Sequence, residues 1–182
     1  SGSNLVVRKK LSLKKIKLTN SKGIYNKSVS QLILAFIFLI CTGIHFLEHK
    51  KDKKKFNRVY FEKYIKFNSY IDQKKILILG NGEISKYLIS KLKHLNKNIS
   101  IVVKNTDIKK IKFKNKYSIH NISKAFSENN LIINLLPENK KTLNVINKKI
   151  LNQLPKYSAL INASRGDIIN HNDLINFIKK DK

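Results

Sequence analysis

Short apolar runs alternate with segments of helical spacing over the second half of the chain. The first run, Ile76–Leu79, contains no polar residue, which is typical of a strand buried on both faces. Apolar residues three or four apart predict a helix over 84–95, a short helical turn is predicted at 150–154, and a capping pattern at 170–173 opens a last helix. The predicted strands are Ile76–Leu79, Ile99–Val103, 117–120, 131–136 and Ala159–Asn162.

This order of strands and helices predicts a parallel sheet, because right-handed crossovers connect successive parallel strands. The expected fold class is α/β, a doubly wound parallel sheet with helices on both faces. We expect one domain over 1–182, with a leading strand and a long interface helix in 1–70 and the sheet core in 71–182. The chain has no methionine and stops within a helical pattern, so a fragment truncated before its last strands is expected.

The first third of the chain contains an uninterrupted apolar stretch, 32–41, within a helical segment at about 28–47. Spanning a bilayer takes about 20 such residues, so a buried or interface helix is favoured over a membrane anchor. Upstream, 15–19 alternates polar and apolar residues as a strand does, and 20–23 contains turn residues. The lysine run at 50–55 is expected to be a solvated loop rather than a nuclear signal.

The formal net charge of +27 suggests a nucleic-acid partner. However, all but three of the 38 basic residues are lysines spread along the chain, whereas base and phosphate recognition favours arginine. Lysine, asparagine and isoleucine share A/T-rich codons, so genome composition explains the charge more simply, and no specific nucleic-acid partner is expected. The single cysteine, Cys41, has apolar neighbours, which predicts an inert buried thiol and a reducing, cytoplasmic compartment.

The first strand leads into the pattern G-x-G-x-x-S, formed by Gly80, Gly82 and Ser85. In a strand–turn–helix of this kind, the first glycine makes the tight turn and the second lets a diphosphate approach the backbone. A third glycine normally lets helix and strand pack closely, and Ser85 replaces it here. The pattern predicts a dinucleotide site, with an ordinary strand–turn–helix corner as the alternative.

The identity of the dinucleotide depends on the end of the second strand. An acid about 20 residues beyond the turn normally binds the ribose of NAD. Here Val103 stands at that distance and Lys104 follows it. Because a lysine pairs with the 2′-phosphate of NADP, NADP is favoured over NAD. Lysine is also the commonest residue of the chain, so Lys104 is compatible with no cofactor role at all.

Arg165 follows a predicted strand and precedes Gly166, which places it at the carboxyl edge of the sheet, where ligands bind in such folds. Its guanidinium is suited to clamping a substrate carboxylate and polarising the adjacent carbonyl. A surface ion pair with Asp167 is the alternative. The five histidines show no metal-ligand spacing, and no metal site is predicted.

Taken together, these residues resemble the D-isomer-specific 2-hydroxyacid dehydrogenases, with the glyoxylate/hydroxypyruvate reductase branch closest. The resemblance implies a Rossmann-like NAD(P)-binding domain and the reduction of a small 2-oxo acid by NAD(P)H. It runs nearly end to end, through the turn with Gly80 and Gly82, the loop Asn134-Leu-Leu-Pro137 with Thr142, and most specifically the segment from Ala159 through Arg165 and Gly166 to Ile169.

The resemblance also implies roles for single residues. Arg165 is the implied catalytic arginine, Gly2 is implied in binding the substrate carboxylate, and the helix at 29–47 in forming a homodimer. The family's glutamate and histidine acid/base pair lies downstream and cannot be assigned within this chain. The implied cofactor-binding residues are Gly80, Gly82, Glu83, Ile84, Lys104, Leu136, Pro137, Thr142, Ala163, Ser164 and Arg165.

Three other interpretations stay open. The chain is compatible with a nonenzymatic regulator, such as a corepressor, that keeps the NAD(P)-binding fold as a sensor. It is also compatible with a basic nucleic-acid-binding domain. The replacement by Ser85 and the missing ribose acid are compatible with a decaying gene product.

Overall fold

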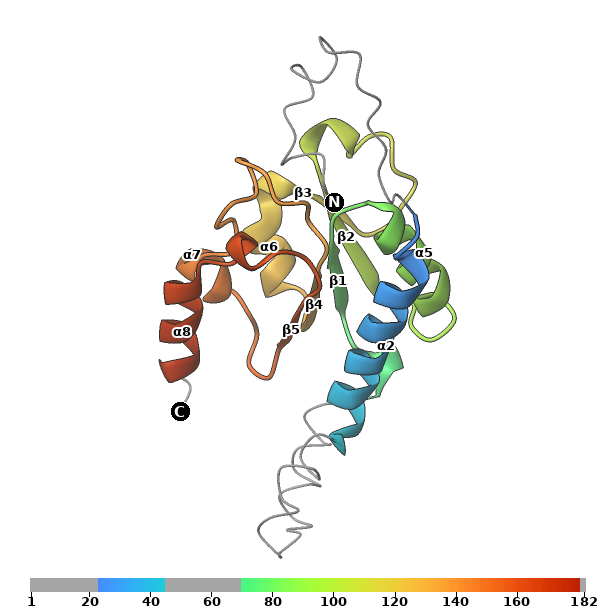
Figure 1. Cartoon of the computed structure of the whole chain (residues 1–182), viewed down its shortest axis with the longest axis horizontal. Coiled ribbons are helices and arrows are strands. Elements are labelled where there is room, and N and C mark those ends of the chain that lie inside the picture. Colours follow the sequence, from blue (N-terminus) through green and yellow to red (C-terminus); the bar gives the residue numbers. More distant parts are fainter. Residues whose placement is uncertain (1–22, 45–69, 181–182) are drawn as a thin grey trace, which may run out of the picture.

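The computed structural model describes residues 23–44 and 70–180, which are built around a five-stranded parallel sheet (Figure 1). The strand order is β3-β2-β1-β4-β5, so the chain starts in the middle of the sheet, builds to one edge and then crosses to the other. This arrangement confirms the predicted doubly wound α/β class. The strands are β1 (Ile76–Leu79), β2 (Ile99–Val103), β3 (Lys116–Ser118), β4 (Leu131–Asn134) and β5 (Ala159–Asn162).

Helices cover both faces of the sheet (Figure 1). On one face, α2 (Asn26–Thr42) packs against α5 (Glu83–Leu92). The other face carries α6 (Ile122–Ser127), α7 (Lys148–Leu151) and α8 (His171–Lys180). Short 3-10 helices in the connections are η2 (Ile71–Gln73), η3 (Asn105–Asp107), η4 (Ile119–Asn121) and η5 (Gly166–Ile168).

The sheet separates two hydrophobic clusters, because successive residues of a strand point to opposite faces. In β1, Ile76 and Ile78 belong to the cluster beneath α2 and α5, whereas Leu77 and Leu79 belong to the cluster beneath α6 and α7. All four side chains are fully buried. The apolar run therefore forms a strand buried on both faces, as its composition predicts.

β4 and α5 end earlier than their apolar spacing predicts, and hydrogen bonds explain where they stop. β4 ends at Asn134 rather than at 136, because the Asn134 side chain accepts the N–H of Leu136 (3.2 Å) and turns the chain. α5 ends at Leu92 rather than at 95, because the N–H groups of Leu95 (2.9 Å) and Asn96 (2.8 Å) both bond the Leu92 carbonyl in a closing turn.

Two further elements differ from their predictions at both ends. β3 covers Lys116–Ser118 instead of 117–120, because the Ser118 hydroxyl accepts the N–H of His120 (3.3 Å) and starts η4. The helical turn predicted at 150–154 is α7, which covers Lys148–Leu151 and so both begins and ends earlier than predicted.

α2 ends at Thr42, before the predicted end near 47. Gly43 adopts a positive φ of 68° and donates its N–H to the Leu39 carbonyl (3.1 Å), which closes the helix. None of the helices in the described part of the chain has the length and apolar character needed to cross a bilayer. The strand predicted at 15–19, residues 20–22 of the predicted turn and the lysine run at 50–55 lie outside the described residues.

Burial shifts the pKa of two side chains near this core. Burial raises the pKa of the Cys41 thiol and so favours its unreactive protonated form, although the residue is half-buried rather than fully buried as predicted. Burial lowers the pKa of Lys74, whose side chain is only 2% exposed just before β1.

Ser85, which replaces a glycine of the turn motif, lies in the first turn of α5 and is only 1% exposed. Its hydroxyl has no hydrogen-bond partner among the described residues. Because an unpaired buried hydroxyl costs about 1–3 kcal/mol, Ser85→Ala is expected to raise the free energy of unfolding by about 1 kcal/mol in urea titrations. Ser90→Ala on the same helix is the control, since the Ser90 hydroxyl donates to the Tyr87 carbonyl (2.7 Å). Equal gains from both variants would contradict this explanation.

Candidate active site

The loops after four of the strands lie along one edge of the sheet, because the strands are parallel and in register. Leu79 of β1 pairs with Val102 of β2 and with Asn134 of β4, and Asn134 pairs with Asn162 of β5. Only β4 separates β1 from β5, so their carboxyl ends lie about 10 Å apart. The predicted site residues that follow these strands, and so meet at this edge, are Gly80, Gly82, Glu83, Ile84, Lys104, Leu136, Pro137, Thr142, Ala163, Ser164 and Arg165.

The two glycines after β1 differ in what they permit. Gly80 has a φ of +102° and donates its N–H to the Val102 carbonyl (2.8 Å), and a Cβ there would stand 3.1 Å from the Leu135 carbonyl oxygen. Only glycine fits that turn without strain. Gly82 has a negative φ of −79°, and a Cβ there would meet nothing within 4 Å. Gly80 therefore serves the turn, whereas Gly82 keeps the space beside the backbone open.

The start of α5 is open to an anion. Gly82 is its N-cap and provides no side-chain hydrogen bond, whereas Asn147 caps α7 by accepting the N–H of Ile150 (3.3 Å). Among the described residues, no hydrogen-bond partner is found for the amides of Glu83 and Ile84, which lie at the positive end of the helix dipole. These donors beside an unobstructed glycine fit the diphosphate of a dinucleotide.

The charges at the start of α5 have opposite effects on an incoming anion. The Glu83 carboxylate is favourable next to the helix dipole but repels an incoming diphosphate. Lys86 pairs with it at 3.1 Å, and both side chains are about half exposed, so the pair is weak. Ile84 is half-buried in the cluster beneath α2, and its carbonyl accepts the Ser30 hydroxyl (3.4 Å).

At the end of β2, Lys104 is exposed and precedes η3. Val103 is 3% exposed and directs its side chain into the core, so no acid occupies the ribose position. The neighbouring Asn105 accepts the Ser118 hydroxyl (3.2 Å), which ties this loop to β3. Lys104 thus stands on an anchored loop with its ammonium in solvent.

The loop after β4 is closed by Thr142, which is 8% exposed. Its hydroxyl donates to the Pro137 carbonyl (2.6 Å) and accepts the N–H of Asn139 (3.0 Å). Leu136 is 6% exposed within the core, while Pro137 is exposed. Pro137 therefore presents the accessible surface of this loop, and Thr142 fixes its shape.

The loop after β5 carries Ala163, Ser164 and Arg165. Ala163 and Ser164 are half-buried and Arg165 is exposed. The Ser164 hydroxyl donates to the Leu136 carbonyl, which joins this loop to the one after β4. In the described residues no salt bridge joins Arg165 to Asp167, so the alternative that the sequence left open for this arginine is not realised here.

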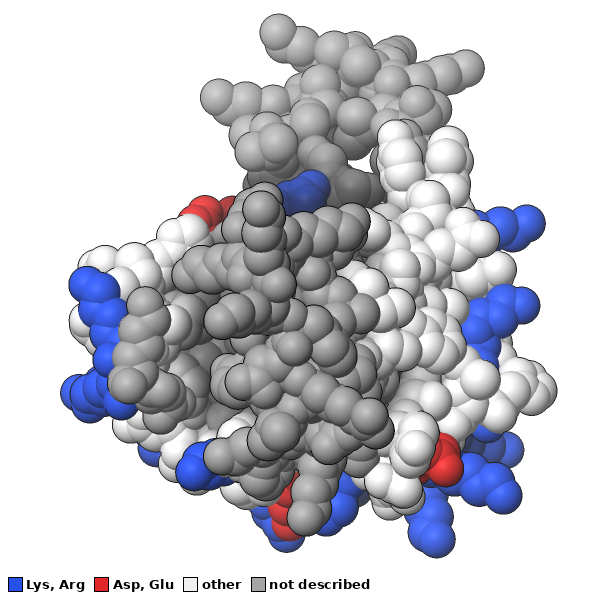
Figure 2. Space-filling model, turned by 90° about the horizontal axis from the view of Figure 1, so that it is seen from below, with Lys and Arg blue, Asp and Glu red and all other residues white. Residues whose placement is uncertain are grey.

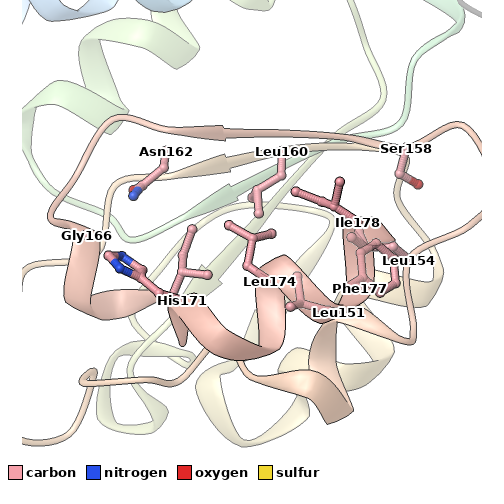
Figure 3. Close-up of a pocket in the computed structure, with 11 residues that line it drawn as sticks. Leu151, Leu154, Ser158, Leu160, Asn162, Gly166, His171, Leu174, Phe177 and Ile178 are labelled. Atoms are coloured by element: carbon pink, nitrogen blue, oxygen red, sulfur yellow. The ribbon is translucent and has the colours of Figure 1, made fainter. Parts of the chain in front are cut away.

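A cavity of about 420 Å³ lies on the far side of β5, between α7 and α8 (Figure 3). It is mostly apolar, but Asn162, Gly166 and His171 form one end of it. A Cβ on Gly166 would stand 3.2 Å from His171 Nε2, so the imidazole packs against this glycine. This cavity is not the dinucleotide edge that the sequence predicts.

Sequence reasoning treated Asn134 and Asn162 only as parts of motifs, and it gave His171 no role in the site. Both asparagines are the last residue of an apolar strand at the ligand edge, and this position could have indicated a role in the site. The capping pattern predicted at 170–173 is confirmed, because the Asn170 side chain accepts the N–H of Asp173 (3.1 Å) at the start of α8. The Asp173 carboxylate accepts the N–H of Lys148 (2.8 Å).

Other predictions concern ligands and surface. Gly2, implied in substrate binding, lies outside the described residues. Within 23–44 and 70–180, no three histidine, cysteine or acidic side chains approach closely enough to hold a metal ion. On the face seen in Figure 2, the lysines and arginines that are visible lie at several separate places around the rim.

Residues 34–182 match the family described as D-isomer specific 2-hydroxyacid dehydrogenase, NAD binding domain. No curated protein matches the chain by sequence. The family match covers the glycine turn, both loops that carry the other predicted site residues, and most of α2.

Solved structures share the fold at low sequence identity. NAD-dependent formate dehydrogenase from Staphylococcus aureus, in complex with NAD, has a TM-score of 0.80 and 19% identity over 99% of this chain and 52% of its own. D-mandelate dehydrogenase from Rhodotorula graminis has a TM-score of 0.79 and 20% identity over 99% and 53%. The NADPH-dependent glyoxylate/hydroxypyruvate reductase from Sinorhizobium meliloti has a TM-score of 0.71 and 14% identity over 89% and 79%. The chain spans about half the length of the first two proteins.

Proposed function

This chain belongs to the D-isomer specific 2-hydroxyacid dehydrogenase family, and we propose that it supplies the nicotinamide-cofactor site and the substrate-binding arginine of such an enzyme. One observation carries the proposal. The open amides at the start of α5 and the exposed Arg165 lie on the same edge of the sheet, on either side of β4. A dinucleotide that crosses this edge extends from the anion site toward the guanidinium.

The proposed reaction reduces a small 2-oxo acid to its 2-hydroxy acid. When bound, NAD(P)H supplies the hydride. The first-turn amides of α5 bind the diphosphate, while Arg165 binds the substrate carboxylate and polarises the neighbouring carbonyl. The carbonyl carbon takes the hydride and its oxygen takes a proton. By family likeness, we propose that this proton comes from a histidine paired with a glutamate.

The substrate class is tested with the complete dehydrogenase and a panel of 2-oxo acids. We propose glyoxylate or hydroxypyruvate, because a clamp made by one guanidinium suits a small substrate with a carboxylate beside its carbonyl. The measured quantity is the loss of NADPH or NADH absorbance with each acid. Reduction of either acid supports the proposal, whereas no turnover of any 2-oxo acid with either cofactor overturns it.

We propose that NADP is preferred over NAD, because Lys104 is exposed at the end of β2 and no acid stands there. Lys104→Asp is expected to raise the Kd for NADPH about tenfold and not to raise the Kd for NADH, since only NADPH carries the 2′-phosphate and an acid at the end of β2 can bond the ribose of NADH. Fluorescence titration measures both constants. Lys112→Asp, also exposed but further along the same connection, is the control. An equal loss for both cofactors would point to a general charge effect instead.

We also propose that the protein is a cytoplasmic homodimer that associates through α2. One side of this helix packs Ile33 and Ile37 in the core, but its other side leaves Leu32 55% exposed and Phe36 and Phe38 each 44% exposed. Such an apolar stripe is typical of a subunit interface. Light scattering of the complete protein decides the point: a dimeric mass supports the proposal and a monomer overturns it.

A further inference from the structure

Two asparagine side chains face each other at the carboxyl edge of the sheet. Asn134 ends β4, Asn162 ends β5, and the two are register partners. Asn134 is fully buried, so its carboxamide needs hydrogen bonds within the protein. These bonds connect the two loops that follow the strands.

Backbone groups fix the orientation of both amides. The N–H of Leu136 bonds Asn134 Oδ1 (3.2 Å), so Asn134 Nδ2 must face β5, where it donates to Asn162 Oδ1 (2.9 Å). The same Asn162 oxygen accepts the N–H of Ser164 (3.2 Å). With its oxygen held by two donors, Asn162 Nδ2 is left to donate to the Arg165 carbonyl (3.3 Å).

The network closes on itself through Ser164. The Ser164 hydroxyl donates to the Leu136 carbonyl, so Leu136 is bonded through both its N–H and its C=O. The loop after β4 and the loop after β5 are therefore joined at two points, one through side-chain amides and one through a hydroxyl. Any displacement of the Arg165 backbone must break a bond in this ring or move the β4 loop with it.

We infer that Asn162 is a positioning residue for Arg165, and that Asn134 anchors it. The inference rests on the proposed function, because it assigns to Asn162 the task of fixing the guanidinium relative to a cofactor bound along the β4 loop. Asn162 holds the Arg165 carbonyl, while His171 packs below the adjacent Gly166. The arginine is therefore held through its backbone and keeps its side chain available for substrate.

Two substitutions at residue 162 isolate the donor. Asn162→Asp keeps an oxygen for Ser164 and Asn134 but has no N–H for the Arg165 carbonyl. Asn162→Ala removes all three bonds and introduces no charge that pairs with the guanidinium. A loss shared by both variants therefore reports the missing donor, whereas a loss limited to Asn162→Asp reports an ion pair with Arg165.

The experiment measures steady-state kinetics and cofactor affinity in the complete dehydrogenase. Both variants are expected to raise KM for the 2-oxo acid about 10- to 100-fold, because small displacements of a positioning group have effects of this size. The Kd for NADPH should stay within about threefold, since the anion site on α5 is untouched. If Asn162 only supported the fold, its substitution would lower the fraction of active enzyme, which reduces the apparent kcat and leaves KM unchanged. Asn152→Asp, exposed at the end of α7, is the control and should change neither constant.

Each outcome has a defined meaning. If the wild-type enzyme is active and both variants keep its KM, the positioning role is wrong while the proposed function stands. A loss confined to Asn162→Asp also overturns the positioning role. If the wild-type protein reduces no 2-oxo acid, the proposed function fails, and the positioning role fails with it. Should both variants prove too unstable to assay, Ser164→Ala gives the same readout, because it removes the second tie between the two loops, from the Ser164 hydroxyl to the Leu136 carbonyl, and must also raise KM.

Discussion

Arg165→Ala in the complete dehydrogenase is expected to raise KM for the 2-oxo acid and to lower kcat, so that kcat/KM falls about 100- to 1000-fold. The substrate carboxylate loses its partner, which raises KM. The carbonyl oxygen loses the positive charge that stabilises it as it becomes negative, which lowers kcat. Steady-state kinetics with saturating NADPH measure both constants.

Arg165→Lys separates charge from geometry. Lysine keeps the positive charge but presents one ammonium instead of a planar fork, so activity between that of wild type and Arg165→Ala is expected. Lys149→Ala, an exposed cation on α7, is the control for the change in net charge. Unchanged KM and kcat in Arg165→Ala would show that this arginine does not bind substrate.

The second large effect is expected at Gly82. No atom lies within 4 Å of a Cβ at this position, and its φ of −79° suits any residue, so Gly82→Ala should leave thermal stability unchanged. The added methyl stands where the diphosphate approaches the backbone, and a crowded contact of this kind costs about 1–3 kcal/mol. The Kd for NADPH is therefore expected to rise about 10- to 100-fold. Fluorescence titration and thermal unfolding measure the two effects.

Gly80→Ala is the matched comparison, because it changes the fold rather than the cofactor space. Its φ of +102° and the Leu135 oxygen at 3.1 Å both oppose a side chain. A loss of about 1–3 kcal/mol in the free energy of unfolding is expected. If Gly82→Ala instead lowered stability and kept cofactor affinity, the assignment of an open anion site would be wrong.

The sequence predicted the doubly wound parallel class of the sheet and the strands whose carboxyl ends form the edge, because continuous apolar runs locate buried strands directly. Ile76–Leu79, Ile99–Val103 and Ala159–Asn162 have the predicted bounds. The predicted end of a strand is wrong where the polar side chain of the last strand residue accepts the backbone N–H two residues further on. Asn134 and Ser118 form such hydrogen bonds, which the spacing of hydrophobic residues does not predict.

Only some features of the candidate site could likewise be predicted from the sequence. The positions of Gly80, Gly82 and Arg165 at one edge were predictable because each follows a strand that reaches that edge, whereas their roles stay predictions. The Asn134–Asn162 contact depends on the register between β4 and β5, which apolar spacing does not determine. His171 was missed because its contact with Gly166 requires the turn through η5, and only the folded loop brings the two together.

A crystal structure of the complete protein with NADPH tests the central claim most directly. We predict diphosphate oxygens within about 3 Å of the amides of Glu83 or Ile84, with the nicotinamide ring on the Arg165 side of β4. A cofactor bound elsewhere, or an Arg165 guanidinium directed away from the nicotinamide, would contradict it.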